Sequence, residues 1–184
     1  LGSQPMVSLL EVISERPEHD AAIEALTDLS FGPGRFAKTA YRFRDGIDQI
    51  RQLGFVIEDE AGNLVASLRF WPAILPDQTE VALLGPISVS PVLRGLGYGR
   101  RLINHGLMRA RALGYPAVVL VGDEPYYRQF GFVGDIMHGL NLPGPVDRKR
   151  LLGLEFTPGV LDYQAGMIQP ATGSARQAIK GTGW

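Results

Sequence analysis

The chain has 184 residues, of which 45% are hydrophobic and none is cysteine, and its formal net charge at pH 7 is -1. This length and apolar content suffice for a domain with a buried core, while the near-zero charge gives no electrostatic basis for binding nucleic acid or an anionic membrane. No apolar run approaches the roughly 20 residues of a membrane-spanning helix, and the lack of cysteine fits a cytoplasmic protein.

We expect a single domain over residues 6–169, because neither an internal repeat nor a second domain is apparent. Residues 1–5 are interpreted as a cloning remnant, with Met6 as the native start, and no charged-then-apolar leader precedes that methionine. The segment 170–184 is rich in glycine, threonine and alanine. We expect it to form a flexible tail.

Strand and helix signals alternate in the first part of the chain. Residues 7–13 predict a strand, and residues 21–29 predict a helix for which Asp20 is a candidate cap. The Phe-Gly-Pro-Gly sequence at 31–34 ends that helix. Residues 36–44 are expected to form a second helix or a helical turn.

A β-hairpin is predicted next. Its strands are expected at 54–58 and 64–70, on either side of the Ala-Gly-Asn turn at 61–63. The segment 71–76 is apolar and bounded by prolines, so it is expected to be a loop that closes the second strand.

The following strand is predicted over 81–89 from its apolar residues. Gly85 and Pro86 interrupt it, because proline cannot donate to a ladder and glycine permits a bulge. An amphipathic helix is expected over 102–113, and Gly114 is expected to stop it.

Between this strand and this helix lies the sequence Arg-Gly-Leu-Gly-Tyr-Gly-Arg at 94–100. Glycines allow positive φ angles and close approach of the backbone to a ligand, and the start of the helix adds unpaired N–H groups and a positive dipole end. We therefore predict a phosphate cradle, although a tight turn without a ligand gives the same pattern. The spacing matches neither a P-loop nor the dinucleotide-binding fingerprint.

The remaining chain predicts further strands at 117–121, 151–156 and 162–168, of which the last two are expected to close the sheet. The first of them is followed at once by the motif Gly-Asp-Glu-Pro-Tyr-Tyr-Arg-Gln-Phe-Gly-Phe at 122–132. This motif places Tyr127 four residues before the glycine of a Gly-Phe pair.

Two motifs carry a resemblance to a known family. Arg94, Gly97 and Gly99 match Gln/Arg-x-x-Gly-x-Gly/Ala, and Tyr127 before the Gly-Phe pair matches a second landmark. In both, the chain resembles the GNAT superfamily of acetyl-CoA-dependent N-acetyltransferases, and the form of the second motif resembles the YhbS-like subgroup. The specific motifs cover roughly residues 80–132.

The resemblance implies an α/β (α+β) domain with a mixed, mostly antiparallel and twisted sheet flanked by helices. It also implies acetyl-CoA as co-substrate, bound in a V-shaped opening between the strand that ends at Val89 and the strand over 117–121. The residues expected to hold it are Ile87, Ser88, Val89, Arg94, Gly95, Leu96, Gly97, Tyr98, Gly99, Arg100 and Tyr126.

Acetyl transfer from a thioester to an amine needs an acid for the thiolate and a donor for the oxyanion. Tyr127 is the candidate acid, since a phenol with a pKa of about 10 is protonated at neutral pH and can donate to a thiolate whose conjugate acid has a pKa near 8.5. The alternative is a tyrosine that only packs on the sheet. The backbone amide of Val89 or of Ile87 is the candidate oxyanion donor.

Glu80, at the start of one strand, and Asp123, at the end of the next, are the candidate bases. Either carboxylate could instead be a solvated strand end, Asp123 could cap a helix, and an ordered water could take the proton. The need for a base depends on the acceptor, because deprotonating a lysine amine at pH 7 costs about 4–5 kcal/mol and an α-amine only about 1.

Direct attack by the amine is favoured over a covalent enzyme intermediate, because the chain has no cysteine and no visibly activated serine. We expect no metal site, since the three histidines are scattered. The expected acceptor is a small amine or an N-terminal amine, and a homodimer stays open. Two alternatives remain: an acyl-CoA-binding or sensor module without turnover, and an acyltransferase for a longer acyl group or a hydroxyl acceptor.

Overall fold

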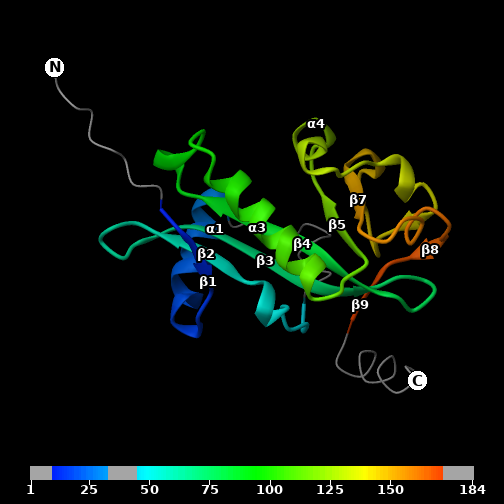
Figure 1. The fold of residues 1–184 in the computed structure, drawn as a ribbon, viewed down its shortest axis with the longest axis horizontal. Helices are drawn as coiled ribbons and strands as arrows, with labels where there is room; N and C mark the ends of the chain where they lie inside the picture. The colour runs from blue at the N-terminus through cyan, green and yellow to red at the C-terminus, as the bar shows by residue number, and fades with distance from the viewer. Residues whose placement is uncertain (1–9, 33–44, 172–184) are drawn as a thin grey trace.

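The computed structural model describes residues 10–32 and 45–171 (Figure 1). The predicted cloning remnant at 1–5, the helix expected over 36–44 and residues 172–184 of the expected tail lie outside these ranges.

The described part of the chain forms strands and helices in the following order: β1 (Val12–Ser14), η1 (Pro17–His19), α1 (Asp20–Phe31), η3 (Arg51–Leu53), β2 (Phe55–Glu58), β3 (Leu64–Ile74), β4 (Glu80–Val89), η4 (Pro91–Leu93), α3 (Tyr98–Ala112), β5 (Ala117–Val121), α4 (Glu124–Tyr127), η5 (Arg128–Phe130), η6 (Asp135–Met137), β6 (Leu140–Asn141), η7 (Arg148–Arg150), β7 (Leu151–Glu155), β8 (Gly166–Met167) and β9 (Gln169–Pro170). Here η marks a short 3-10 helix.

The main sheet has the strand order β1-β2-β3-β4-β5-β7, and β9 adds to β3. All of its neighbouring strands are antiparallel except β4 and β5, which run parallel. This confirms the expected mixed, mostly antiparallel sheet. The parallel pair is short, with register only at Ala82–Val118 and Leu83–Val119. Beyond these pairs the two strands separate towards their carboxyl ends.

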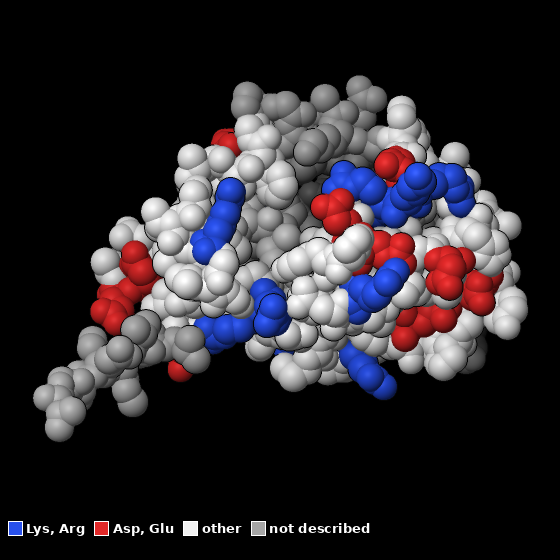
Figure 2. Space-filling model, turned by 90° about the horizontal axis from the view of Figure 1, so that it is seen from above, with Lys and Arg blue, Asp and Glu red and all other residues white. Residues whose placement is uncertain are grey.

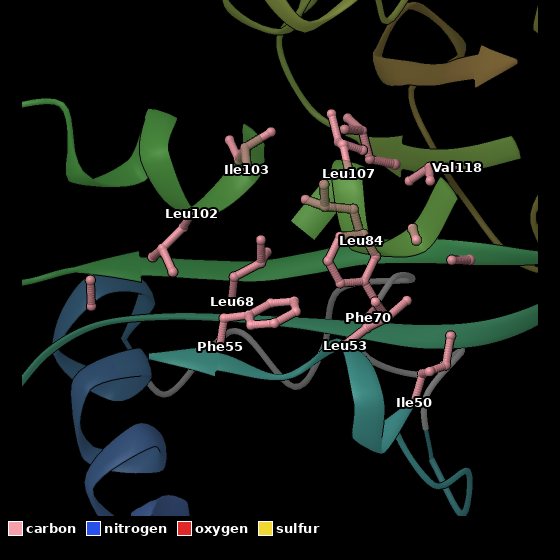
Figure 3. Packing of buried hydrophobic residues seen from close by; sticks show 14 of the residues in the cluster. Ile50, Leu53, Phe55, Leu68, Phe70, Leu84, Leu102, Ile103, Leu107 and Val118 are labelled. Carbon is pink, nitrogen blue, oxygen red and sulfur yellow. The ribbon is translucent and has the colours of Figure 1, made fainter. Parts of the chain in front are cut away.

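Helices cover both faces of the sheet (Figure 1). The main core lies between the sheet and α3, where apolar residues of the helix meet apolar residues of the strands (Figure 3). Gly106 lets the helix approach, because a Cβ there would lie 2.7 Å from Cε2 of Phe70. A second cluster on the other face joins Leu83 and Val119 to Met137, Leu140 and other residues of the C-terminal part.

The N-terminal helix differs from its prediction at the cap. His19 is the N-cap residue and Asp20 is already helical, so the expected capping by Asp20 is wrong. The Asp20 carboxylate instead accepts a hydrogen bond from Arg69 Nη2 at 2.7 Å. The described part of the predicted strand at 7–13 forms β1 one residue later, at Val12–Ser14.

The loop expected over 71–76 is also wrong, because β3 continues to Ile74. Its Pro72 is tolerated since β2 pairs with β3 only up to Leu68, so no β2 partner needs the missing N–H. On that edge the Pro72 carbonyl accepts from the backbone N–H of Ala171 at 3.1 Å.

Two features of β4 and α3 confirm their predictions. Leu68 pairs with Ile87 and Phe70 pairs with Leu84, so Gly85 and Pro86 face one residue of β3 and form a bulge. The helix α3 ends before Gly114, which has a φ of +91°.

In the C-terminal part, β5 coincides with its predicted range and β7 forms within the predicted segment 151–156. The strand expected over 162–168 is reduced to β8, which pairs with β6 in a separate two-stranded sheet and does not close the main sheet. The strand β9 instead joins the main sheet at β3, where Pro170 pairs with Ala73. Within residues 10–32 and 45–171, no helix has the length and apolar character needed to cross a membrane.

Candidate functional site

A hollow of about 250 Å³ lies where β4 leads through η4 into α3. Gly95 has a φ of +82°, and Gly97, the N-cap residue of α3, has a φ of +86°. The N–H groups of the first helical turn have no acceptor within the helix and are directed along its axis beyond its start. The lining residues are Val89, Leu93, Arg94, Gly95, Gly97, Tyr98, Gly99, Arg100 and Tyr126. The expected cradle is therefore a real concavity at a helix N-terminus.

Gly99 and Tyr126 bring α3 close to β4 and α4. A Cβ on Gly99 would lie 3.7 Å from Cδ1 of Ile87, from Cγ2 of Val89 and from the hydroxyl oxygen of Tyr126. Tyr126 is 44% exposed and lines this hollow. Its pKa is raised by burial, and the nearby Arg100 acts in the opposite direction.

Arg94 and Arg100 stand exposed at this hollow, and neither forms an ion pair with another residue of the described ranges. Arg101 turns the other way, because its guanidinium donates to the Leu10 carbonyl. Leu96 is 62% exposed in the same loop. Figure 2 shows Lys and Arg side chains on both sides of the recess in this face of the molecule.

The backbone of β4 is directed alternately towards β3 and towards the gap beside β5. Ser90 donates its N–H to the Val65 carbonyl at 2.8 Å, so by the alternation of an antiparallel ladder Ser88 also bonds to β3. The N–H and C=O groups of Ile87 and Val89 are then directed into the gap. Two of the three strand residues expected to contact the cofactor therefore present backbone groups there that do not bond to β3.

Ser88, the third of these residues, is placed differently. The residue is 1% exposed and its hydroxyl donates to Thr27 Oγ1 of α1 at 3.4 Å. Both its backbone and its side chain are thus engaged away from the gap between β4 and β5.

Tyr127 follows β5 at the end of α4 and is largely buried. Its ring packs edge-on against Phe132, with centroids 6.0 Å apart, and against Tyr126 at 4.9 Å. A Cβ on Gly122 would lie 2.4 Å from Cε2 of Tyr127, so only glycine leaves room for this ring. Burial raises the pKa of Tyr127 to about 12, assisted by Tyr126 and Asp123. Its hydroxyl is therefore protonated at any physiological pH.

The two candidate bases lie at opposite ends of the sheet. Asp123 is the N-cap residue of α4, and its carboxylate is 3.4 Å from Nε of Arg150, with the side chain 75% exposed. Glu80 begins β4 and pairs with Ile74. At about 3.3 Å per residue, the five residues from Glu80 to Gly85 span about 16 Å. The structure thus brings the cradle, Val89 and the pair Tyr126 and Tyr127 together. The two candidate bases, Glu80 and Asp123, lie far from each other.

Two residues beside the bulge were missed by the sequence reasoning. Trp71 of β3 donates its indole N–H to the Gly85 carbonyl at 2.7 Å. Arg69, the residue opposite the bulge, is buried and ion-paired with Glu15. A charged residue inside an apolar strand is a usable signal for a buried ion pair, whereas nothing in the sequence aligns Trp71 with Gly85.

The comparisons with known proteins give the class of protein to which this sheet and its glycine-rich helix N-terminus belong. A model of the Acetyltransferase (GNAT) family matches residues 21–132, which is more than half of the chain. The chain therefore belongs to the GNAT family of acetyltransferases.

Among its relatives is the uncharacterized N-acetyltransferase YhbS of Escherichia coli (strain K12), which is 31% identical over 156 residues, covering 84% of this chain and 92% of that protein. The crystal structure of YhbS from Escherichia coli in complex with CoA matches with a TM-score of 0.77 and 26% identity, over 92% of this chain and 93% of that one. A GNAT family acetyltransferase from Brucella melitensis in complex with acetyl-CoA matches with a TM-score of 0.65 and 27% identity, over 88% and 95% of the two chains.

Proposed function

We propose that this protein transfers the acetyl group of acetyl-CoA to an amine by direct attack within a ternary complex. The observation that carries the proposal is the separation of β4 from β5 directly beside the positive-φ glycines at the start of α3. The opening joins the hollow at the start of α3, where we place the phosphates, to a stretch of β4 whose Ile87 and Val89 backbone groups do not bond to β3. The CoA and acetyl-CoA complexes of the relatives from Escherichia coli and Brucella melitensis support the choice of co-substrate.

In this proposal the pyrophosphate of acetyl-CoA lies at the start of α3, where helix N–H groups and the helix dipole favour an anion. Arg94 and Arg100 pair with its oxygens, because a guanidinium binds phosphate through two parallel hydrogen bonds. The amide groups of the pantetheine arm pair with Ile87 and Val89 of β4 in the manner of an added strand.

The amine nitrogen attacks the thioester carbonyl carbon, so an N–C bond forms while the C–S bond breaks. The oxyanion of the tetrahedral intermediate accepts from a backbone N–H of β4, and the thiolate accepts from the Tyr127 hydroxyl. With its pKa of about 12, full proton transfer to a thiolate of pKa near 8.5 is uphill by about 5 kcal/mol. Tyr127 thus stabilises the departing sulfur chiefly as a hydrogen-bond donor, and the proton follows from solvent.

The amine must lose a proton as it attacks, and water is the proposed acceptor of that proton. Asp123 is exposed and near Arg150, and Glu80 lies about 16 Å along β4 from the bulge. With water as the proton acceptor, an amine of low pKa is the better substrate, because an α-amine costs about 1 kcal/mol to deprotonate at pH 7 and a lysine amine about 4–5. The proposed acceptor is therefore a small α-amine or an N-terminal amine.

Calorimetric titration of acetyl-CoA tests the cofactor site. Gly97→Asp introduces a negative charge into the cradle, and Gly62→Asp is its matched control, since Gly62 has a φ of +83° and, like Gly97, has no atom within 4 Å of where a Cβ would lie. We expect binding to wild type and to Gly62→Asp, and loss of binding in Gly97→Asp. No binding of acetyl-CoA or longer acyl-CoAs by folded wild-type protein would overturn the proposal.

An amine panel with each acyl-CoA that binds then tests turnover. Transfer by wild type and a much slower reaction in Tyr127→Phe are expected. Binding without transfer to any amine would instead favour a sensor module, and transfer only to hydroxyl acceptors or only from longer acyl-CoAs would favour the broader acyltransferase alternative.

A further inference from the structure

The bulge in β4 lies where the proposed pantetheine pairing ends. Gly85 and Pro86 occupy the space opposite the single residue Arg69, and Ile87 is the first residue after the bulge whose N–H is directed into the gap. The direction of the Ile87 N–H depends on the backbone dihedral angles of Gly85 and Pro86.

The backbone of the bulge does not fix its own orientation. Gly85 has a φ of +123°, and a glycine residue moves through a much wider range of φ and ψ than any other residue. Proline at position 86 supplies no N–H that could tie the bulge to β3. The ladder with β3 holds the bulge at Leu84 and Ile87, and a side chain that bonds to the Gly85 carbonyl restricts the peptide groups between them further.

Trp71 supplies such a hold. Its indole N–H donates to the Gly85 carbonyl at 2.7 Å, and its ring packs against the second hydrophobic cluster. Because the Trp71 ring packs against the second cluster, on the face of the sheet opposite α3, this hydrogen bond holds the Gly85 carbonyl towards that face.

The strand that carries Trp71 is itself anchored at this point. Arg69, two residues earlier and 6% exposed, donates from Nη2 to Glu15 at 2.8 Å and to Asp20 at 2.7 Å. These bonds connect the middle of β3 to the residues after β1 and to the start of α1. Trp71, which donates to the Gly85 carbonyl, thus belongs to a strand that Arg69 ties to Glu15 and Asp20.

We propose that Trp71 is a positioning residue for the acyl-transfer step: its hydrogen bond to the Gly85 carbonyl sets the bulge so that the Ile87 N–H is directed at the thioester oxygen. This inference rests on the proposed function. Trp71 acts through the backbone of β4, from the face of the sheet opposite α3. It has no part in holding the phosphates.

The test removes the indole N–H in two ways. Trp71→Phe keeps an aromatic ring, and site-specific replacement of Trp71 by benzothienylalanine keeps the bicyclic shape with sulfur in place of N–H. We expect kcat to fall about 10- to 100-fold in both, as for a displaced catalytic group, while KM for acetyl-CoA stays within about twofold. Leu161→Ala, a cavity variant in the same cluster, is the control for general loosening, with little change in kcat below its melting temperature.

Amide NMR of the acetyl-CoA complex provides a readout that does not need turnover. We expect the Ile87 amide resonance to shift in both Trp71 variants and to stay in place in Leu161→Ala. Unchanged kcat in the benzothienylalanine variant, or an unchanged Ile87 resonance, would overturn the positioning role. If wild type binds acetyl-CoA but acetylates no amine, the proposed function fails, and the Ile87 resonance still decides whether Trp71 sets the bulge.

Discussion

Tyr126 and Tyr127 are neighbours in the chain but occupy different environments. Tyr126 lines the hollow at the start of α3, while Tyr127 lies between its neighbouring aromatic rings and Gly122. The family motif selects Tyr127 as the acid, and that role stays a prediction. Burial gives the assignment a physical test, because it raises the pKa of this hydroxyl to about 12.

The first prediction concerns stability at alkaline pH. The Tyr127 proton leaves the unfolded chain near pH 10 and the folded protein near pH 12, so the folded state binds more protons in this window and its stability falls as pH rises. Between pH 9 and 11, the unfolding free energy of wild type should fall by about 1.3 kcal/mol more than that of Tyr127→Phe. Urea titrations at both pH values measure the difference. Tyr163→Phe removes an exposed hydroxyl, and an equal effect there would contradict the assignment.

The second prediction concerns the buried ion pair of Arg69 and Glu15, whose side chains are 7% and 3% exposed. Arg69→Leu leaves the Glu15 carboxylate buried, with only the Gln49 amide as a remaining side-chain donor among the described residues. We expect a loss of about 3–5 kcal/mol of unfolding free energy, measured by urea denaturation. The double variant Arg69→Leu, Glu15→Leu should recover most of it. A double variant as unstable as the single one would show that packing rather than charge is responsible.

At the scale of elements, α3 carries two glycines with opposite surroundings, which gives the third prediction. A Cβ on Gly99 would meet its neighbours at ordinary contact distances of 3.7 Å, whereas a Cβ on Gly106 would lie 2.7 Å from Phe70 and 3.0 Å from Leu68. Gly99→Ala should therefore stabilise the protein by about 0.5–1 kcal/mol through helix propensity, and Gly106→Ala should destabilise it by about 1–3 through overpacking. The two midpoints of urea unfolding should move in opposite directions, and a shift of the same sign would refute this account of the helix–sheet contact.

The elements that the sequence predicted well are those whose signals are local. The extent of β5, the stop of α3 at Gly114 and the bulge at Gly85 follow from apolar runs, glycine and proline. The loop expected at 71–76 was wrong because proline fits into a strand where no neighbouring strand needs its missing N–H. At Pro72 the neighbour on that edge is a residue that donates its own N–H to the Pro72 carbonyl. That partner, Ala171, lies 99 residues further along the chain.

In the candidate site, too, the features with local sequence signals were predicted and those that depend on distant partners were not. The cradle could be predicted from its glycines, and two of them have the expected positive φ. The direction of the Ser88 side chain towards Thr27, the partner of Trp71 and the separation of Glu80 from the opening depend on strand register. Register is set by pairing across the sheet, and a single sequence does not contain it.

At the scale of the whole molecule, the opening divides a sheet whose two parts meet at β4 and β5. A ligand that contacts both parts and binds only the folded state should stabilise the fold as a unit. The fourth prediction is that acetyl-CoA at 100 times its Kd raises the unfolding free energy by about 2.7 kcal/mol, measured by urea titration with and without the ligand.

Hydrogen exchange locates this effect. In the free protein, the Ile87 and Val89 amides should exchange faster than the Ser88 amide, which is directed at β3. Acetyl-CoA should slow the first two. Slowing at α3 alone, with Ile87 and Val89 unaffected, would contradict pairing along β4.

The strand β9 is only two residues long, yet it covers part of an edge of β3. Through the Ala73–Pro170 and Ile74–Gln169 pairs, it shields a run of buried apolar residues that ends with Leu75. A chain shortened to Met167 would present that run as a bare strand edge, the kind of surface through which β-sheet proteins associate. Solubility at high concentration, rather than catalysis, is therefore the property that a C-terminal deletion would impair first.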